Sequence, residues 1–268
     1  MRMYEAFMQS NEEYLSSIRY FLEISKNIEG LHDLLVRGSS IDTKKCVANW
    51  SGINFTIVVE EITSSVLEQV RAVYQQMITK YPFKISITFV TKKDLQSYRH
   101  QHGIKPLYYS AFLQNSVSLL RNVTFTEKKH SLNELKYNCF TNVVYLIHDL
   151  RIRYMKENQE NMASIIKFCC HLIKTTKHLI RNAIFIRSGL MNKEVDQELF
   201  RLYFPKIDAQ FPNILDSYKE NWAELIKNRK QLIRIINHVF PIVEKIYEDT
   251  VCYAEQLEFA PEISLEPI

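Results

Sequence analysis

Two stretches decide the fold of this chain: the turn Gly38-Ser39-Ser40, and the run Trp50-Ser51-Gly52-Ile53-Asn54-Phe55-Thr56-Ile57-Val58-Val59 that follows after nine further residues. From residue 53 onward the second stretch is rich in β-branched and aromatic residues, which is typical of a strand. A short apolar run at residues 34–36 precedes the glycine-serine turn. The order strand, turn, loop, strand is therefore expected here.

The neighbouring residues extend this pattern into a small α/β unit. A capping-box pattern at residues 65–68 predicts the start of a helix, which Pro82 ends. In residues 85–89 isoleucine and phenylalanine alternate with serine and threonine, which predicts a strand with one buried face. A similar capping box at Ser10 predicts an earlier helix that ends before Gly30.

After about Thr91 the periodicity is helical throughout. We expect helices from Ser131 towards Asn158, over 162–188 with Gly189 as the terminating residue, over 193–204, over 213–228, and from Lys230 to about Leu257 around Pro241. The predicted fold class is α+β. It comprises a small mixed-sheet domain in residues 1–122, an α-helical bundle domain in 123–257 and an acidic tail in 258–268.

Composition excludes several classes of protein. No apolar run approaches the roughly 20 residues that cross a bilayer, so no membrane association is expected. The five cysteines are odd in number and form no C-x-x-C pair, which favours reduced thiols and a cytoplasmic protein. Residues 101–243 carry 21 basic and 12 acidic side chains. This excess could attract polyphosphates or nucleic acid, but solvation of helix surfaces explains it more simply, and nucleic acid is not an expected partner.

The Gly-Ser turn followed by Trp50-Ser51 and a strand resembles the signature of the nucleotidyltransferase superfamily, which includes DNA polymerase β and the antibiotic nucleotidyltransferases. In that family a Ser-Asp-x-Asp motif leads into the second strand, and a third acid lies on a later strand. These acids hold two Mg²⁺ ions that neutralise phosphate charge and activate an acceptor hydroxyl. The resemblance implies a nucleotidyltransferase-like sheet domain in which Gly38, Ser39, Ser40, Ser51 and Asn54 contact the nucleotide phosphates.

The metal-binding acids of that signature are missing. Gly52 and Asn54 stand at the two Asp positions, and Ser86 stands where the third acid is expected. Without carboxylates, two close Mg²⁺ ions repel each other and keep their own water shells. Asp42 is the one acid that could reach the site from the loop. No catalytic constellation is therefore intact, no metal site is expected, and no cofactor is required; Mg²⁺ is needed only if the chain is an active enzyme.

Two features of the helical half bear on nucleotide and metal binding. Residues 185–194 resemble a segment of the antibiotic nucleotidyltransferases in which a helix ends in glycine and a lysine-bearing helix follows, which implies that Arg187 and Lys193 face the nucleotide. Helix capping and surface charge are their alternative roles. His171 and His178 lie seven apart without the acids or thiols that a zinc site needs, so no zinc is expected.

Three functions remain open at this point. The first is a nucleotidyltransferase-fold protein that binds a nucleotide, another phosphorylated small molecule or a regulatory ligand without metal-dependent transfer. The second is an active enzyme that transfers a nucleotide from ATP or GTP to a small-molecule or protein acceptor. The third is a non-catalytic interaction or signalling output protein that binds a protein partner through the helical bundle. Loss of the acids with retention of the Gly-Ser turn favours the first.

Overall fold

The structure is a computed structural model, and it describes residues 11–37, 50–93, 116–122, 131–157, 160–190, 192 and 194–257. Contacts divide the chain into two compact units, Met1–Lys129 and His130–Ile268. The expected domain boundary after residue 122 lies near this division. The expected acidic tail, residues 258–268, lies outside the described residues.

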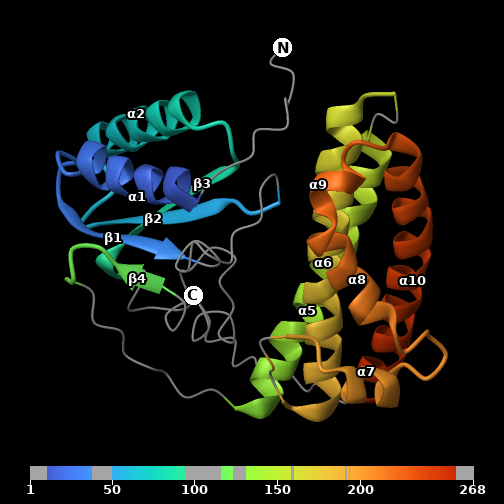
Figure 1. Cartoon of the computed structure of the whole chain (residues 1–268). Coiled ribbons are helices and arrows are strands. Elements are labelled where there is room, and N and C mark those ends of the chain that lie inside the picture. Colours follow the sequence, from blue (N-terminus) through green and yellow to red (C-terminus); the bar gives the residue numbers. More distant parts are fainter. Residues whose placement is uncertain are drawn as a thin grey trace. The chain divides into compact units, whose positions relative to one another are not determined.

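A four-stranded mixed sheet forms the centre of the first unit (Figure 1). Its strands are β1 (Leu31–Arg37), β2 (Ile53–Val59), β3 (Ile85–Thr91) and β4 (Ser116–Ser118), in the spatial order β3-β2-β1-β4. Strand β1 is antiparallel to β2 and to β4, whereas β2 and β3 are parallel. The sheet in the first unit and the helices in the second confirm the α+β class.

Two helices, α1 (Asn11–Ser25) and α2 (Ser64–Lys80), lie on one side of this sheet (Figure 1). The ring of Phe21 on α1 stacks on Phe55 of β2 at 3.9 Å between centroids, inside an apolar core that both helices share with the sheet. Helix α2 begins two residues earlier than the capping box with Ser65 as its cap suggested. Its N-cap is Thr63, whose hydroxyl accepts a hydrogen bond from the backbone N–H of Val66.

Strand β4 corrects the expectation that everything after Thr91 is helical. The buried carboxylate of Asp33 on β1 accepts hydrogen bonds from the hydroxyl of Ser118 at 2.6 Å, from the backbone N–H of Leu120 at 3.1 Å and from that of Asn122 at 3.0 Å. These bonds attach the 116–122 segment to β1. The strand is three residues long and has too little local pattern to be recognised from sequence.

The second unit is helical, and most of its helices begin and end where the sequence predicts. They are α5 (Leu132–Lys156), α6 (Met162–Ser188), α7 (Gln197–Tyr203), α8 (Phe211–Glu220), α9 (Trp222–Leu225) and α10 (Arg229–Gln256). Ser131 caps α5 with its hydroxyl, and Gly189 ends α6 at a φ of 71°, which confirms both predictions. The helix expected over 213–228 is instead two helices that meet at Asn221.

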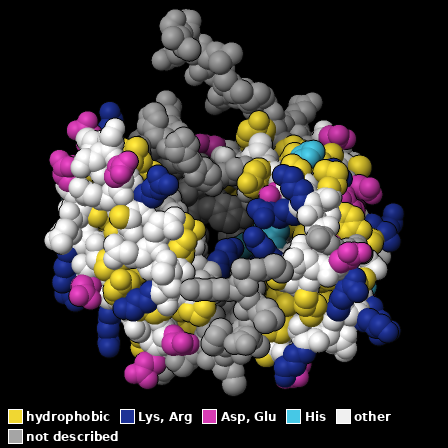
Figure 2. Space-filling view, turned by 90° about the horizontal axis from the view of Figure 1, so that it is seen from above, with side chains coloured by type: hydrophobic (Ala, Val, Ile, Leu, Met, Phe, Trp, Pro, Cys, Tyr) yellow, Lys and Arg dark blue, Asp and Glu magenta, His cyan; other side chains and the backbone are white. Residues whose placement is uncertain are grey.

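Three further observations concern membrane-spanning helices, surface charge and the cysteines. Within the described ranges, no helix combines the length and apolar character that a bilayer span requires. Lys and Arg side chains are present on several sides of the helical unit in Figure 2. The four described cysteines, Cys139, Cys169, Cys170 and Cys252, are thiols rather than disulfides. Cys46 lies outside the described residues.

Candidate functional site

The face of the sheet opposite α1 and α2 carries polar residues near one end. Arg37 on β1 pairs in register with Asn54 on β2, and Asn54 pairs with Ser86 on β3. Partners in register share a face, and side chains two apart along a strand also share it. Thr56 and its partner Thr88 therefore lie on the same face as these three. The positions that the sequence assigned to missing acids, 54 and 86, are direct neighbours.

Arg37 is the residue of this group that sequence reasoning missed. One Nη of its guanidinium donates a hydrogen bond to the hydroxyl of Thr88 at 3.2 Å, so the side chain crosses the sheet face over β2. Burial lowers the pKa of Arg37 to about 10, which leaves it charged at neutral pH. A signal was present in the sequence: a cation ends the apolar run directly before Gly38.

Gly52 lies immediately before β2 and has no space for a side chain. A Cβ built at this position would stand 2.8 Å from the backbone oxygen of Lys84 and 3.1 Å from its Cβ. The contact is tight because the N–H of Ile53 donates to that same oxygen at 2.9 Å, which draws the two strands together. A carboxylate at position 52, where the family signature has its first Asp, would require the backbone to move.

No other described acid replaces the missing ones. Glu60 follows the far end of β2, where its carboxylate lies 3.1 Å from Nδ1 of His32 and 3.7 Å from Nζ of Lys92. Among the described residues, no group of three or more His, Cys, Asp or Glu could hold a metal ion. Asp42 lies outside the described residues. The described part of the site therefore offers an amide, hydroxyls and a guanidinium.

The predicted phosphate-binding residues are only partly within the described chain. Gly38, Ser39 and Ser40 follow Arg37 directly in sequence but lie outside the described residues, as does Lys193. Ser51 is buried, and its backbone oxygen accepts a hydrogen bond from the hydroxyl of Tyr14 at 3.1 Å. The buried hydroxyl of Thr56 has no hydrogen-bond partner among the described residues.

Arg187 lies at the end of α6, within the helical unit. Its guanidinium donates to the backbone oxygen of Tyr203 at 2.5 Å and to the carboxylate of Asp249 at 2.6 Å. The rings of Phe204 and Tyr253 lie 4.6 Å and 5.0 Å from its central carbon. These contacts join α6 to α10 and to the end of α7, which is a structural role. Nucleotide contact by Arg187 stays a prediction, and it would require these bonds to be exchanged.

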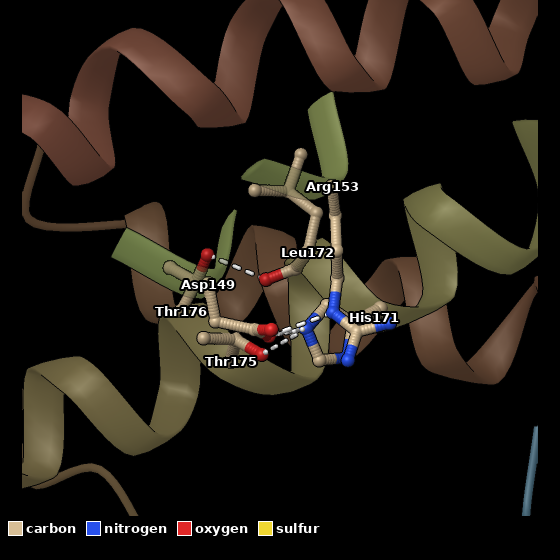
Figure 3. Close-up of polar contacts among 6 residues, drawn as sticks. All are labelled: Asp149, Arg153, His171, Leu172, Thr175 and Thr176. Carbon is tan, nitrogen blue, oxygen red and sulfur yellow. Dashed lines mark hydrogen bonds and ion pairs between the residues drawn. The ribbon is translucent and has the colours of Figure 1, made fainter. Parts of the chain in front are cut away.

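A second polar cluster joins α5 and α6 (Figure 3). The carboxylate of Asp149 accepts from Nε of Arg153 at 2.7 Å and lies 2.8 Å from Nε2 of His171, and the Thr175 hydroxyl is 3.4 Å from the same nitrogen. A Thr-His-Asp triad needs the acid and the nucleophile on opposite ring nitrogens. The cluster is therefore a helix-to-helix contact, and His178 is not part of it.

No model of a known protein family matches the sequence, and no curated protein does. The fold does match a solved structure, the spectinomycin adenyltransferase AAD(9) from Enterococcus faecialis, which was solved with ATP and spectinomycin. The TM-score is 0.50 with 12% sequence identity, over 88% of this chain and 100% of that chain. At this identity the likeness establishes a nucleotidyltransferase-like fold, as the Gly-Ser turn and the following strand predicted.

Proposed function

We propose that this chain is a nucleotidyltransferase-fold protein that binds a nucleotide, or another small molecule bearing phosphate, without metal-dependent transfer. One observation carries the proposal: a mostly buried guanidinium, Arg37, lies beside Asn54 and contacts Thr88, where the family signature has metal-binding acids. A fixed cation repels Mg²⁺ and attracts phosphate oxygens, to which arginine can donate two parallel hydrogen bonds.

The backbone at Gly52 supports the same proposal. A nucleotidyltransferase that had lost a single acid could regain it by one substitution, but here the Cβ itself collides with the carbonyl of Lys84. The tight backbone at Gly52 thus supports the proposal independently of the side chains.

ATP is the first ligand to test, because the protein of similar fold was solved with it. We expect ATP or GTP to raise the melting temperature equally in EDTA and in Mg²⁺. Each kcal/mol by which nucleotide binding stabilises the folded chain should raise the melting temperature by about 2–4 °C. Adenosine, which lacks phosphate, is the matched control and should give no rise.

Two outcomes would contradict this function. A rise that requires Mg²⁺, with release of pyrophosphate when acceptors are added, would identify an active transferase that recruits metal through Asp42, Asn54 and the substrate. No rise with either nucleotide would favour an interaction protein that acts through its helical bundle.

A further inference from the structure

A groove of about 400 Å³ lies between α2 and β3 in the first unit; Ser86 of the proposed phosphate site also lines it, whereas Arg37, Asn54 and Thr88 do not. Side chains at positions 67, 70, 71 and 74 line it from the helix, and this i, i+3, i+4, i+7 spacing places them on one face. Residues of the 84–89 segment line it from the strand. Its lining is thus one helix face and one strand.

The strand wall is an edge of the sheet. Strand β3 is terminal in the order β3-β2-β1-β4, so among the described strands none pairs with its outer side. The N–H of Ile53 bonds the carbonyl of Lys84, and in a parallel pair the backbone groups that face the partner strand alternate. The N–H and C=O groups of Ile85, Ile87 and Phe89 therefore point away from β2. These three residues also line the groove.

The helix wall exposes apolar surface to solvent. Leu67 is 44% exposed and Tyr74 is 37% exposed, while Val70 between them is buried. Figure 2, seen from the side on which α1 and α2 lie in Figure 1, shows hydrophobic side chains at the surface of this unit. An apolar helix face beside a sheet edge is the arrangement that receives an extended peptide.

The charge of the groove indicates what kind of peptide it fits. Arg71 and Lys84 are the charged residues of its described lining, and none of the described lining residues is an acid. A second copy of this chain would bring another Arg71 and Lys84 to the same contact, so pairing of two β3 edges is disfavoured by like-charge repulsion. An acidic segment complements both cations.

We propose that this groove binds an extended, acidic peptide segment of a partner protein, which adds to β3 as a further strand. The peptide places alternate apolar side chains against Leu67 and Tyr74, and its acidic groups lie near Arg71 and Lys84. A small molecule cannot use the repeated backbone groups of Ile85, Ile87 and Phe89 in this way. The inference does not depend on nucleotide binding by the opposite face of the sheet.

The test uses the full chain and a fluorescein-labelled peptide of seven residues, the length of β3, with alternating valine and threonine between terminal glutamates. Fluorescence anisotropy should show saturable binding. Arg71→Glu should weaken it about tenfold or more, because a charge-assisted contact becomes a repulsion. Arg19→Glu is the matched control: it makes the same charge change at an exposed position on α1 that does not line the groove, and should leave the affinity within about twofold.

Two altered peptides separate strand addition from charge attraction alone. Lysine in place of the terminal glutamates should abolish binding. N-methylation of the five internal residues should also abolish it, because it removes the backbone donors that face β3 whichever way the peptide runs. Equal binding of the N-methylated peptide, or of the original peptide to Arg71→Glu, would overturn the proposal. A lack of peptide binding to the wild-type chain would also overturn the proposal. The same holds if sedimentation shows a dimer that Arg71→Glu dissociates. The ATP-dependent rise in melting temperature should be the same in Arg71→Glu as in wild type, so failure here is distinguishable from failure of the nucleotide proposal.

Discussion

At position 52, which the sequence assigned to the first acid of the family signature, the main chain leaves no room for a Cβ. The carbonyl of Lys84 occupies the place that a Cβ would need, at 2.8 Å. Gly52→Asp should therefore destabilise the chain by about 1–3 kcal/mol, the usual effect of forcing atoms into a packed site. Urea unfolding measures this change, and Gly52→Ala should show most of it, since the clash is at Cβ. If Gly52→Asp were as stable as wild type, residue 52 would not be tightly packed against the carbonyl of Lys84.

Asn54 behaves differently because it lies within the strand beside a cation. Asn54→Asp places a carboxylate next to Arg37 without a change in side-chain size, so the stability should stay within about 1 kcal/mol. The new charge should repel phosphate and weaken ATP binding about tenfold or more. Thermal shift with ATP in EDTA checks both effects. Stronger ATP binding in Mg²⁺ than in EDTA by this variant would instead show that one acid restores a metal site.

At the residue scale the sequence assigned Gly52, Asn54 and Ser86 to the acid positions by their spacing from the Gly-Ser turn, and this assignment stays a prediction. The sequence did not single out Arg37. The role of Arg37 depends on the strand register, which brings it beside Asn54 and lets it reach Thr88 on a third strand. Register is a non-local property, so the sequence alone did not reveal that contact.

Among the elements, β4 depends on one side chain that lies more than 80 residues earlier. Asp33 is fully buried and accepts bonds from Ser118, Leu120 and Asn122. Asp33→Ala should cost about 2–4 kcal/mol in urea unfolding, because several partly buried donors lose their acceptor. Ser118→Ala, which removes one donor only, should cost about 1 kcal/mol. Equal losses in the two variants would show that the carboxylate does not hold the segment.

The contact between α5 and α6 has a pH dependence that can be measured. Burial alone would raise the pKa of Asp149, but hydrogen bonds and charge from Arg153 and His171 outweigh it, so its pKa lies below the usual value. The stabilisation is then complete above the unfolded-state pKa of about 4 and is lost as the pH falls through the lower folded-state pKa.

Asp149→Asn should consequently destabilise the chain by about 1–3 kcal/mol at pH 7. The difference from wild type should shrink below about pH 4, where wild-type Asp149 itself becomes protonated. Urea unfolding across pH 3–7 measures this, with Glu198→Gln, an exposed acid on α7, as the control. If the stability difference between Asp149→Asn and wild type did not change with pH, the ion pair would not be its cause.

Element prediction succeeded where a local pattern carries the information. The Ser131 cap, the positive φ at Gly189 and the alternation in β3 are properties of neighbouring residues. Strand β4 was not predicted from the sequence because its pairing is fixed by Asp33, which lies far away along the chain. Likewise, Thr63 and Ser65 are both competent caps, and the helix uses Thr63.

For the molecule as a whole, the likeness to the adenyltransferase covers 88% of this chain and therefore reaches into both units. The nucleotidyltransferase-like fold is thus shared, while the difference in the residues at the acid positions stays a prediction from the sequence. Function follows the site rather than the fold. In the proposed function, Arg37, with the neutral side chains around it, supplies the attraction for phosphate that metal ions supply elsewhere.

Titration calorimetry of ATP into the full chain in EDTA, comparing wild type, Arg37→Lys and Arg37→Gln, tests this claim most directly. We expect wild type to bind without metal, Arg37→Lys to retain part of the affinity, and Arg37→Gln to lose about tenfold or more, while Arg19→Gln binds as wild type does. ATP binding that is absent in EDTA, or that is unchanged in Arg37→Gln, would contradict it.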